Sequence, residues 1–241
     1  MKSIIIILVL AVLLTPQTSK KKVTFFAEDG LEITADLYVE KEEYPYILLF
    51  HQAESSRGEY NEIAIKLAKL RYNCLAVDLR AGNNSNYISN ETAKKAREQR
   101  LNPSYLDAKQ DIVAAIDYAY SLNQKEVILF GSSYSASLSI LEGKDNPKVS
   151  AVIAFSPGEY FGDDLRMENE IDTFPKPLFV AGTQFEAPYI KEMLKNLPEE
   201  SITFFEPESS MGEHGSKALW NENPEKDEYW LALLFFFNSI K

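Results

Sequence analysis

The sequence predicts an α/β fold in which a mostly parallel central sheet, with an N-terminal antiparallel hairpin, carries helices on both faces. Short apolar runs typical of buried strands alternate with segments of helical periodicity along most of the chain. Two alternating segments flank Asp29–Gly30, a strong hairpin signal. The length of 241 residues and the hydrophobic content of 45% fit one domain with a substantial core.

The predicted elements follow one another from Val23 onward. The hairpin occupies 23–39, and apolar runs predict strands at 46–50, 73–77, 126–130, 149–155, 177–181 and 201–205. Helices are expected at 61–70, 92–100, 105–122, 136–143, 189–197 and 224–237, with Gly143 suited to a helix C-terminus. The polar segments 81–90 and 159–176 are expected to be loops.

The N-terminal segment has the layout of a secretory signal peptide. Lys2 precedes eleven consecutive apolar residues, 4–14, and a small, polar stretch follows. A membrane-spanning helix needs about twenty apolar residues, so no stable membrane span is expected. We therefore expect a signal peptide at 1–19 and one domain at 23–241. We expect cleavage between Thr15 and Lys22, with an uncleaved anchor as the alternative, and a secreted or periplasmic protein.

Composition excludes several classes of function. The formal net charge is −11 and the sequence pI is about 4.8. Nucleic acids and anionic membranes are bound by clustered Lys and Arg, so neither is expected as a partner. A single cysteine, Cys74, rules out an internal disulfide and a multi-cysteine metal site. Its apolar surroundings indicate a buried core thiol.

Polar residues follow most of the predicted strands. In a parallel sheet, ligands bind beyond the carboxyl ends of the strands, so these residues are candidates for a site. They lie in 51–53, 78–80, 133, 156–159, 182–186 and 206–215. The chain has two histidines, His51 and His214, and both belong to this set.

Ser133 is the candidate nucleophile. It lies at the apex of Gly131-Ser-Ser-Tyr-Ser135, between a predicted strand and a predicted helix. Such a turn holds the hydroxyl above the sheet and places the following N–H at a helix N-terminus. A serine hydroxyl is too weakly acidic to attack a carbonyl unaided. It therefore needs a base, and an acid that orients the base.

His214 is the candidate base. It lies in the loop after the last predicted strand, where Gly212 and Gly215 allow a turn that aims the ring at the site. The acid must come from another strand end. Glu186, which follows the strand at 177–181, is the first choice, and Glu159, which follows the strand at 149–155, is the alternative.

From Val23 onward the sequence resembles the α/β-hydrolase superfamily, and most of all its single-domain dienelactone-hydrolase-type and esterase members. The order Ser133, Glu186, His214 matches the order of the catalytic triad in that fold. By this resemblance, the oxyanion hole would use the backbone N–H of Tyr134 and that of Ala53 or Gln52. The resemblance is carried by 48–53, 73–80, 131–135, 181–186 and 214–215.

The sequence departs from the family pattern at three positions. Gln52 stands where a glycine usually follows the first histidine, and Ser135 replaces the second glycine of the nucleophile turn. Phe185 occupies the position of the usual aspartate, which shifts the acid to Glu186. Serine is small enough for a tight approach of strand and helix, and the longer Glu side chain compensates for part of a displaced backbone.

The resemblance implies a carboxylesterase-like serine hydrolase that cleaves a small or exposed ester through an acyl-enzyme, with no metal and no organic cofactor. Two alternatives are a non-catalytic scaffold of this fold that binds a ligand or partner, and a peptidase of the same fold. The segment 81–100 is the expected cap over the site.

Other polar and aromatic residues receive structural interpretations. His51 is expected to fix its loop by hydrogen bonding, and Asp78 is expected to pair with Arg80 near a strand end. Arg80 is alternatively a clamp for a substrate carboxylate. Four loop aromatics are expected to border the pocket: Tyr87, Tyr160, Phe161 and Phe185.

Overall fold

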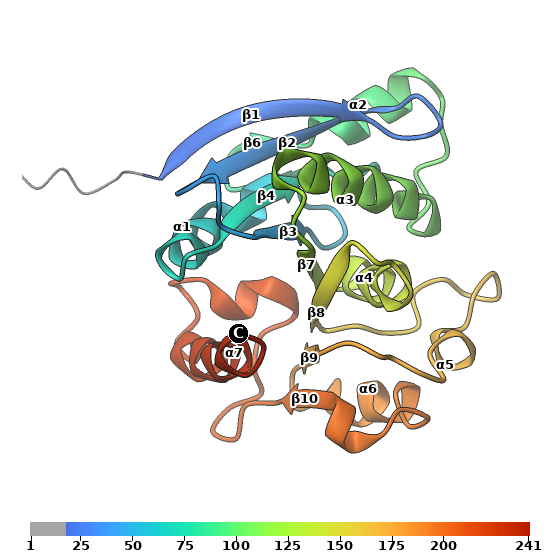
Figure 1. Cartoon of the computed structure of the whole chain (residues 1–241). Coiled ribbons are helices and arrows are strands. Elements are labelled where there is room, and N and C mark those ends of the chain that lie inside the picture. Colours follow the sequence, from blue (N-terminus) through green and yellow to red (C-terminus); the bar gives the residue numbers. More distant parts are fainter. Residues whose placement is uncertain (1–17) are drawn as a thin grey trace, which may run out of the picture.

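The computed structural model describes residues 18–241, which are built around one eight-stranded sheet (Figure 1). The strand order is β1-β2-β4-β3-β7-β8-β9-β10. β1 pairs antiparallel with β2 and β2 pairs antiparallel with β4, whereas all other neighbours are parallel. The strands are β1 (Ser19–Phe26), β2 (Glu32–Val39), β3 (Tyr46–Phe50), β4 (Asn73–Val77), β7 (Val127–Ser132), β8 (Val149–Phe155), β9 (Leu178–Ala181) and β10 (Ile202–Phe205). The predicted fold class is confirmed.

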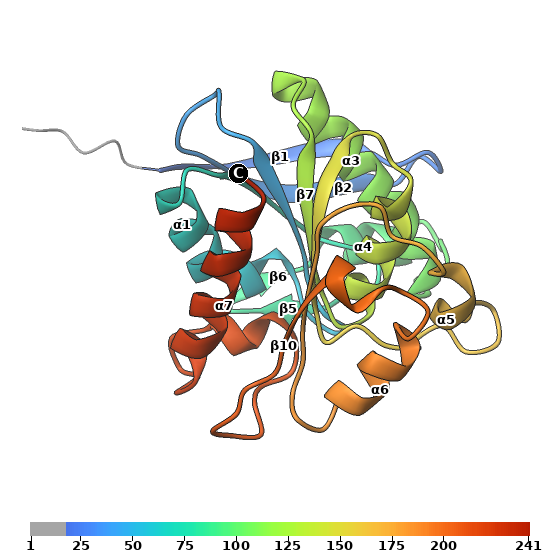
Figure 2. The ribbon, with the colours of Figure 1, turned by 60° about the horizontal axis from the view of Figure 1, so that its bottom comes forward.

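Helices cover both faces of the sheet (Figure 2). α1 and α7 pack on one face, and α3, α4 and α6 pack on the other. The helices are α1 (Asn61–Lys69), α2 (Glu91–Glu98), α3 (Lys109–Asn123), α4 (Tyr134–Lys144), α5 (Met167–Glu170), α6 (Ala187–Met193) and α7 (Lys226–Ser239). Short 3-10 turns are η1 (Arg57–Tyr60), η2 (Leu106–Ala108), η3 (Glu199–Ser201) and η4 (Gly215–Leu219).

The central strands are apolar throughout because both of their faces are covered. In β3, Leu48 and Phe50 enter the core beneath α3 and α4, whereas Ile47 and Leu49 enter the core beneath α1 and α7. Alternate side chains of a strand point to opposite faces, so a strand buried on both sides needs a continuous apolar run. The same pattern holds in β7. These parallel strands end at one edge of the sheet, and the candidate site lies there.

The structure differs from the predicted elements in four places, one of which is the short helix α5 (Met167–Glu170) within the predicted loop at 159–176. β1 begins at Ser19 rather than Val23, because the lysines at 20–22 pair with β2 through the backbone of an exposed edge strand. The loop at 81–90 contains two short paired strands, β5 (Asn84–Ser85) and β6 (Ile88–Ser89). Gly143 is the second-last residue of α4, which extends one residue beyond the prediction, and a Cβ there would come 2.6 Å from Val152 Cγ2 of β8.

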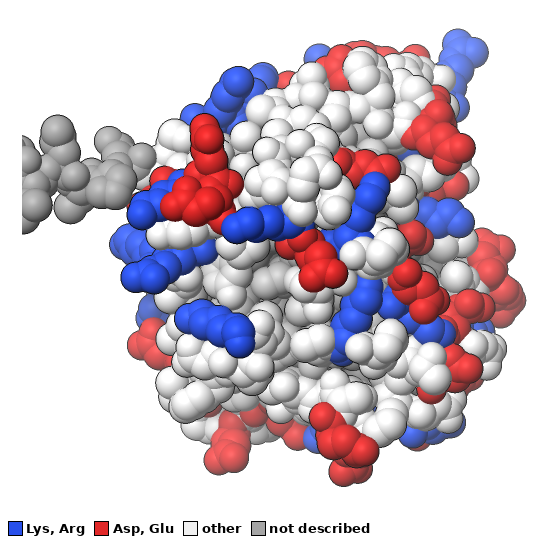
Figure 3. Space-filling view, in the orientation of Figure 1, with Lys and Arg blue, Asp and Glu red and all other residues white. Residues whose placement is uncertain are grey.

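Most of the predicted signal peptide lies outside the described residues. Within residues 18–241, no helix combines the length and the apolar character that crossing a bilayer would need. Cys74 is buried, as expected, and burial raises the pKa of its thiol. On the face shown in Figure 3, acidic and basic side chains are interspersed.

Candidate active site

Ser133 lies in a strained turn between β7 and α4. Its backbone has φ 60° and ψ −127°, a combination that costs a non-glycine residue about 1–3 kcal/mol and recurs at functional sites. The Ser133 N–H donates to Phe155 O at 2.8 Å, which ties the turn to β8. Gly131 permits the close approach of α4, because a Cβ there would lie 2.4 Å from Ala136 Cα. The turn therefore presents Ser133 at the sheet edge, as the sequence predicts.

Ser135 has a structural role in this turn. Its side chain is fully buried, and Oγ accepts a hydrogen bond from Ser132 N–H at 2.9 Å. The same hydroxyl lies 2.7 Å from Phe50 O at the end of β3. The departure from the family glycine is therefore accommodated, since the hydroxyl links the turn to the neighbouring strand.

Glu186 and His214 are joined directly. Glu186 Oε1 is hydrogen-bonded to His214 Nδ1, and Oε2 accepts from Ser156 Oγ at 2.7 Å and from Thr183 N–H at 2.9 Å. Partial burial acts to raise the pKa of Glu186, but the hydrogen bonds from His214, Thr183 and Ser156 outweigh it and lower the pKa to about 2. The carboxylate is thus ionised near neutral pH, and an Nδ1–H directed at it leaves Nε2 of His214 free to accept a proton.

The histidine loop lies against the serine turn. Gly215 N–H donates to Ser156 Oγ at 2.9 Å, and Ser216 N–H donates to Ser132 Oγ at 2.9 Å. These contacts bring the residues that follow His214 next to the residue that precedes Ser133. No direct hydrogen bond joins the Ser133 hydroxyl to His214 in residues 18–241; in ligand-free enzymes such contacts often tighten only when substrate binds.

Ser156 belongs to the strand-end segment 156–159 that the sequence marks as a candidate for the site, but its role was not predicted. It follows β8 with φ 53°, and its hydroxyl bridges the Glu186 carboxylate and the Gly215 N–H. The Ser156 side chain therefore connects Glu186, which follows β9, with the loop that carries His214. The only signal in the sequence is the position of Ser156-Pro-Gly at a strand end.

Glu159 has a different partner. Its carboxylate accepts hydrogen bonds from Met167 N–H at 2.8 Å and Glu168 N–H at 3.0 Å, at the start of α5. These bonds satisfy the free N–H groups of the helix terminus. Of the two candidate acids, the structure brings Glu186 to His214.

The N–H groups of Gln52 and Ala53, the two expected donors from the loop after β3, differ in whether they already have an acceptor. Gln52 N–H donates to the carboxylate of buried Glu59 at 3.2 Å, whereas in residues 18–241 the N–H groups of Ala53 and Tyr134 have no protein acceptor. Tyr134 is the first residue of α4, where such free N–H groups favour negative charge. Ala53 is therefore the better partner for Tyr134 in an oxyanion hole.

Gln52 and Glu59 fill the space beneath the histidine loop. Gln52 Oε1 is buried without a hydrogen-bond partner in the described chain, and it would lie 2.7 Å from a Cβ placed on Gly215. Glu59 Oε1 accepts from Ser216 Oγ at 2.5 Å. Glu59 thus holds both the loop after β3 and the histidine loop. Sequence reasoning did not identify Glu59, because the contact that joins it to the histidine loop is with Ser216, 157 residues away in the chain.

His51 fixes its loop, as expected. Nε2 accepts from Leu79 N–H at 2.9 Å, and Nδ1 lies 2.7 Å from Gln52 O. The ring is completely buried. His51 therefore joins the loops after β3 and β4.

The predicted Asp78–Arg80 pair is wrong. Asp78 pairs with Arg57 at 2.5 Å, and Arg80 pairs with Asp111 and Asp29, each at 2.7 Å. Arg80 is only 2% exposed. Its guanidinium is enclosed by carboxylates of the protein and is not free to clamp a substrate carboxylate.

A small cleft of about 370 Å³ is connected to the serine turn through Tyr160 and Tyr105, although Ser133, Glu186 and His214 do not themselves line it. Tyr160 borders it; burial raises the pKa of the Tyr160 hydroxyl, the Ser133 side chain acts to lower it, and the hydroxyl donates to Ser156 O at 2.9 Å. Tyr105 also borders it and stacks on Tyr134 with ring centroids 4.4 Å apart. Phe161 lines the cleft as predicted, and its other lining residues are Pro103, Ser104, Leu106 and Asp164.

Two of the predicted pocket aromatics point elsewhere. Phe185 is 73% exposed and Tyr87 is fully exposed, and neither lines this cleft. The predicted cap is also wrong for α2, because Thr92 Oγ1 at its start accepts from Thr34 N–H of β2. The wall of the cleft comes instead from the segment just after α2, residues 103–106.

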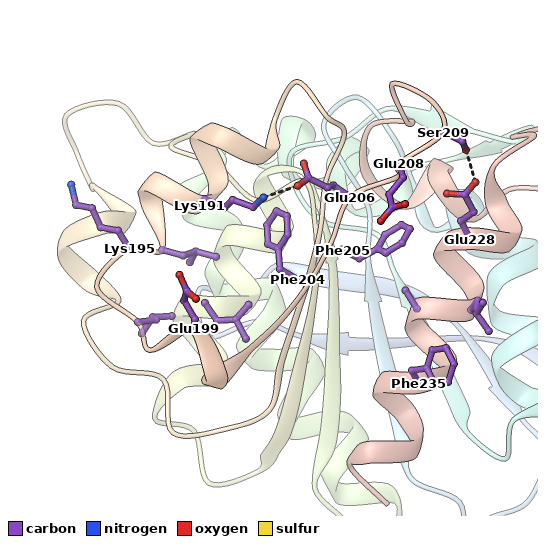
Figure 4. Close-up of a pocket in the computed structure, with 15 residues that line it drawn as sticks. Lys191, Lys195, Glu199, Phe204, Phe205, Glu206, Glu208, Ser209, Glu228 and Phe235 are labelled. Atoms are coloured by element: carbon purple, nitrogen blue, oxygen red, sulfur yellow. Dashed lines mark hydrogen bonds and ion pairs between the residues drawn. The ribbon is translucent and has the colours of Figure 1, made fainter.

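A larger hollow of about 1260 Å³ follows the edge strand β10 between α6 and α7 (Figure 4). Its rim is charged, and Lys191 is bonded to Glu206 at 2.6 Å. None of its lining residues belongs to the Ser133, Glu186 and His214 set. Short length and charged neighbours are common protections of an edge strand. Within residues 18–241, no cluster of three or more His, Cys, Asp or Glu side chains is placed to hold a metal ion.

Comparison with known proteins shows the fold. No protein-family model and no curated protein sequence matches the chain. The structure resembles an esterase from Pyrococcus furiosus with a TM-score of 0.65 at 16% identity, covering 92% of this chain and 93% of that one. A dienelactone hydrolase from Anabaena variabilis gives a TM-score of 0.65 at 16% identity, covering 92% and 96%.

An acylaminoacyl peptidase from Pyrococcus horikoshii is also similar, with a TM-score of 0.63 at 17% identity, and the match covers 93% of this chain but 42% of that one. At such identities the likeness speaks for the fold alone. Together with the observed strand order, it shows that the chain has the α/β-hydrolase fold.

Proposed function

We propose that this protein is a carboxylesterase-like serine hydrolase that uses Ser133 as nucleophile, His214 as base and Glu186 as the orienting acid. The observation that carries the proposal is the Glu186–His214 hydrogen bond, held in a loop that lies against the strained Ser133 turn. A base aligned by an ionised carboxylate, close to a strained serine turn at the sheet edge, is the arrangement that acyl transfer requires.

The proposed reaction proceeds through an acyl-enzyme. His214 Nε2 takes the proton of the Ser133 hydroxyl as Oγ attacks the ester carbonyl carbon. The N–H groups of Tyr134 and Ala53 then stabilise the oxyanion, and the loss of one such donor typically costs about 3–4 kcal/mol. The protonated His214 gives its proton to the departing alcohol. Water, deprotonated by His214, then attacks the acyl-enzyme; the acyl group leaves as the carboxylic acid, and His214 returns the proton to Ser133 Oγ.

The names of the similar structures agree with ester cleavage, since they include an esterase and a dienelactone hydrolase. The small cleft beside Ser133 favours a small or exposed ester as substrate. The proposed chemistry uses only protein side chains, backbone N–H groups and water. We also propose that the protein is exported by its N-terminal segment.

Hydrolysis of p-nitrophenyl esters of increasing chain length tests the proposal. We expect the wild type to cleave short-chain p-nitrophenyl esters faster than long-chain ones. It should also cleave them faster than p-nitroanilides of amino acids and peptides. Ser133→Ala should lower kcat/KM by at least about 1000-fold. Ser121→Ala, at an exposed position near the end of α3, is the matched control and should keep wild-type activity.

A folded wild-type protein that cleaves no ester would overturn the proposal in favour of a non-catalytic scaffold. Retained activity in Ser133→Ala would place the chemistry elsewhere. A preference for the anilides would identify a peptidase.

A further inference from the structure

The cleft beside Ser133 has aromatic walls and one charged lining residue. Tyr105, Tyr160 and Phe161 contribute rings from two loops that meet there. Tyr134 covers one face of the Tyr105 ring, and Tyr105 remains 38% exposed. The charged residue is Asp164, and no Lys or Arg lines the cleft.

Asp164 is free to interact with a ligand. It is exposed, and in residues 18–241 its carboxylate has neither an ion pair nor a hydrogen bond from a side chain. Arg166, the nearest basic residue in sequence, is directed to Asp163, with the closest atoms 3.7 Å apart. A carboxylate beside aromatic faces attracts cations, because ring quadrupoles and the negative charge act in the same direction.

The cations nearest the strand ends are enclosed elsewhere. Arg80 is held by Asp111 and Asp29, and Arg57 by Asp78, Asp36 and Glu91. Since no Lys or Arg lines the cleft, a substrate carboxylate there would meet Asp164 and no lining residue of opposite charge. The formal net charge of −11 adds to this repulsion.

We infer that the cleft formed by Tyr105, Tyr160, Phe161 and Asp164 is a substrate subsite that favours a cationic group, such as a quaternary or protonated amine, and rejects a carboxylate. This inference rests on the proposed ester hydrolysis at Ser133. It adds the charge class of the substrate to that function.

Three matched thioesters test the subsite with one assay for the released thiol. They are acetylthiocholine, its uncharged isostere in which a tert-butyl group replaces trimethylammonium, and 3-(acetylthio)propanoate. We expect kcat/KM for acetylthiocholine to exceed that of the isostere by about tenfold at low ionic strength. The anionic thioester should be cleaved more slowly than the isostere. Added salt should reduce both differences.

Two neighbouring variants separate the subsite from the general charge of the protein. Asp164→Asn should lower the ratio of acetylthiocholine to isostere cleavage several-fold. Asp163→Asn makes the same change of charge one residue away, at a position that does not line the cleft, and should leave the ratio unchanged.

The outcomes distinguish the proposed subsite from the ester hydrolysis on which it rests. Cleavage of the isostere without a cationic advantage, or an equal response to both Asp variants, overturns the subsite and leaves ester hydrolysis standing. Failure to cleave all three thioesters and the p-nitrophenyl esters overturns both.

Discussion

Ser156 offers a test of how the acid and the base are held together. Its hydroxyl donates to Glu186 Oε2 at 2.7 Å and accepts from the buried Gly215 N–H at 2.9 Å. Ser156→Ala removes one hydrogen bond from an ionised carboxylate, worth about 1.5–3 kcal/mol, and leaves one buried N–H unsatisfied, at a cost of about 1–3 kcal/mol. If about 2 kcal/mol of this is felt in the transition state, kcat/KM falls by about 30-fold.

The backbone of Ser156 supplies a control for folding. At φ 53° a glycine is unstrained, so Ser156→Gly removes the hydroxyl and relieves the backbone at the same time. We expect Ser156→Gly to unfold in urea at a higher concentration than Ser156→Ala, yet to show the same loss in kcat/KM with little change in KM. Both variants are compared by urea titration and by steady-state hydrolysis of p-nitrophenyl acetate.

The result that refutes this reasoning is a Ser156→Gly protein with wild-type kcat/KM. Recovery of activity in step with stability would show that Ser156 supports the fold alone and does not align the Glu186–His214 pair.

The remaining predictions concern the acid, the buried carboxylate, one helix and the leader. Because the pKa of Glu186 is lowered from 4.5 to about 2, its ionised form stabilises the fold above about pH 4.5, and this contribution is lost as the pH falls toward 2. Screening limits it to about 1–2 kcal/mol, because the Glu186 side chain is 26% exposed, and a Glu186→Gln variant should lack this loss in acid titrations followed by circular dichroism. The same variant should lower kcat/KM by about 10³–10⁴-fold, because an amide can hold His214 in the wrong tautomer; near-normal activity would remove Glu186 from the mechanism. Glu59→Gln should destabilise the protein by about 1–2 kcal/mol in urea and lower kcat, and an unchanged kcat would confine Glu59 to folding. Gly143→Ala should cost about 1–3 kcal/mol of stability at unchanged kcat/KM per folded molecule, because its Cβ would crowd Val152; wild-type stability would show that α4 can shift. Expressed in a secreting host, the mature protein should begin at or before Ser19, where β1 starts, and a cytoplasmic product with an intact Met1 would argue against export.

Local sequence pattern was sufficient for most of the fold and for the residues at strand ends. Strands such as β3 and β4 are buried on both faces, so their apolar runs mark them without knowledge of their neighbours. The strand-to-helix turn identified Ser133 as the candidate nucleophile. The position after the last strand identified His214 as the candidate base. The start of β1 could not be predicted, because its lysines pair through the backbone and give no apolar signal.

Interactions between distant segments were beyond the reach of local pattern. Ser156 contacts Glu186 and Gly215, and Glu59 contacts Ser216, 157 residues away in the chain. Arg80 lies two residues from Asp78, yet its partners come from other elements of the fold. Such partners depend on how elements pack, and a spacing rule within one segment cannot specify them.

Covalent labelling with a fluorophosphonate, followed by peptide mapping, tests the central claim most directly, because the reagent requires an activated serine nucleophile. We expect a single label on Ser133. We also expect Ser133→Ala to abolish labelling and Glu186→Gln to slow it. A folded wild-type protein that stays unlabelled, or that carries the label on another serine, would contradict the account.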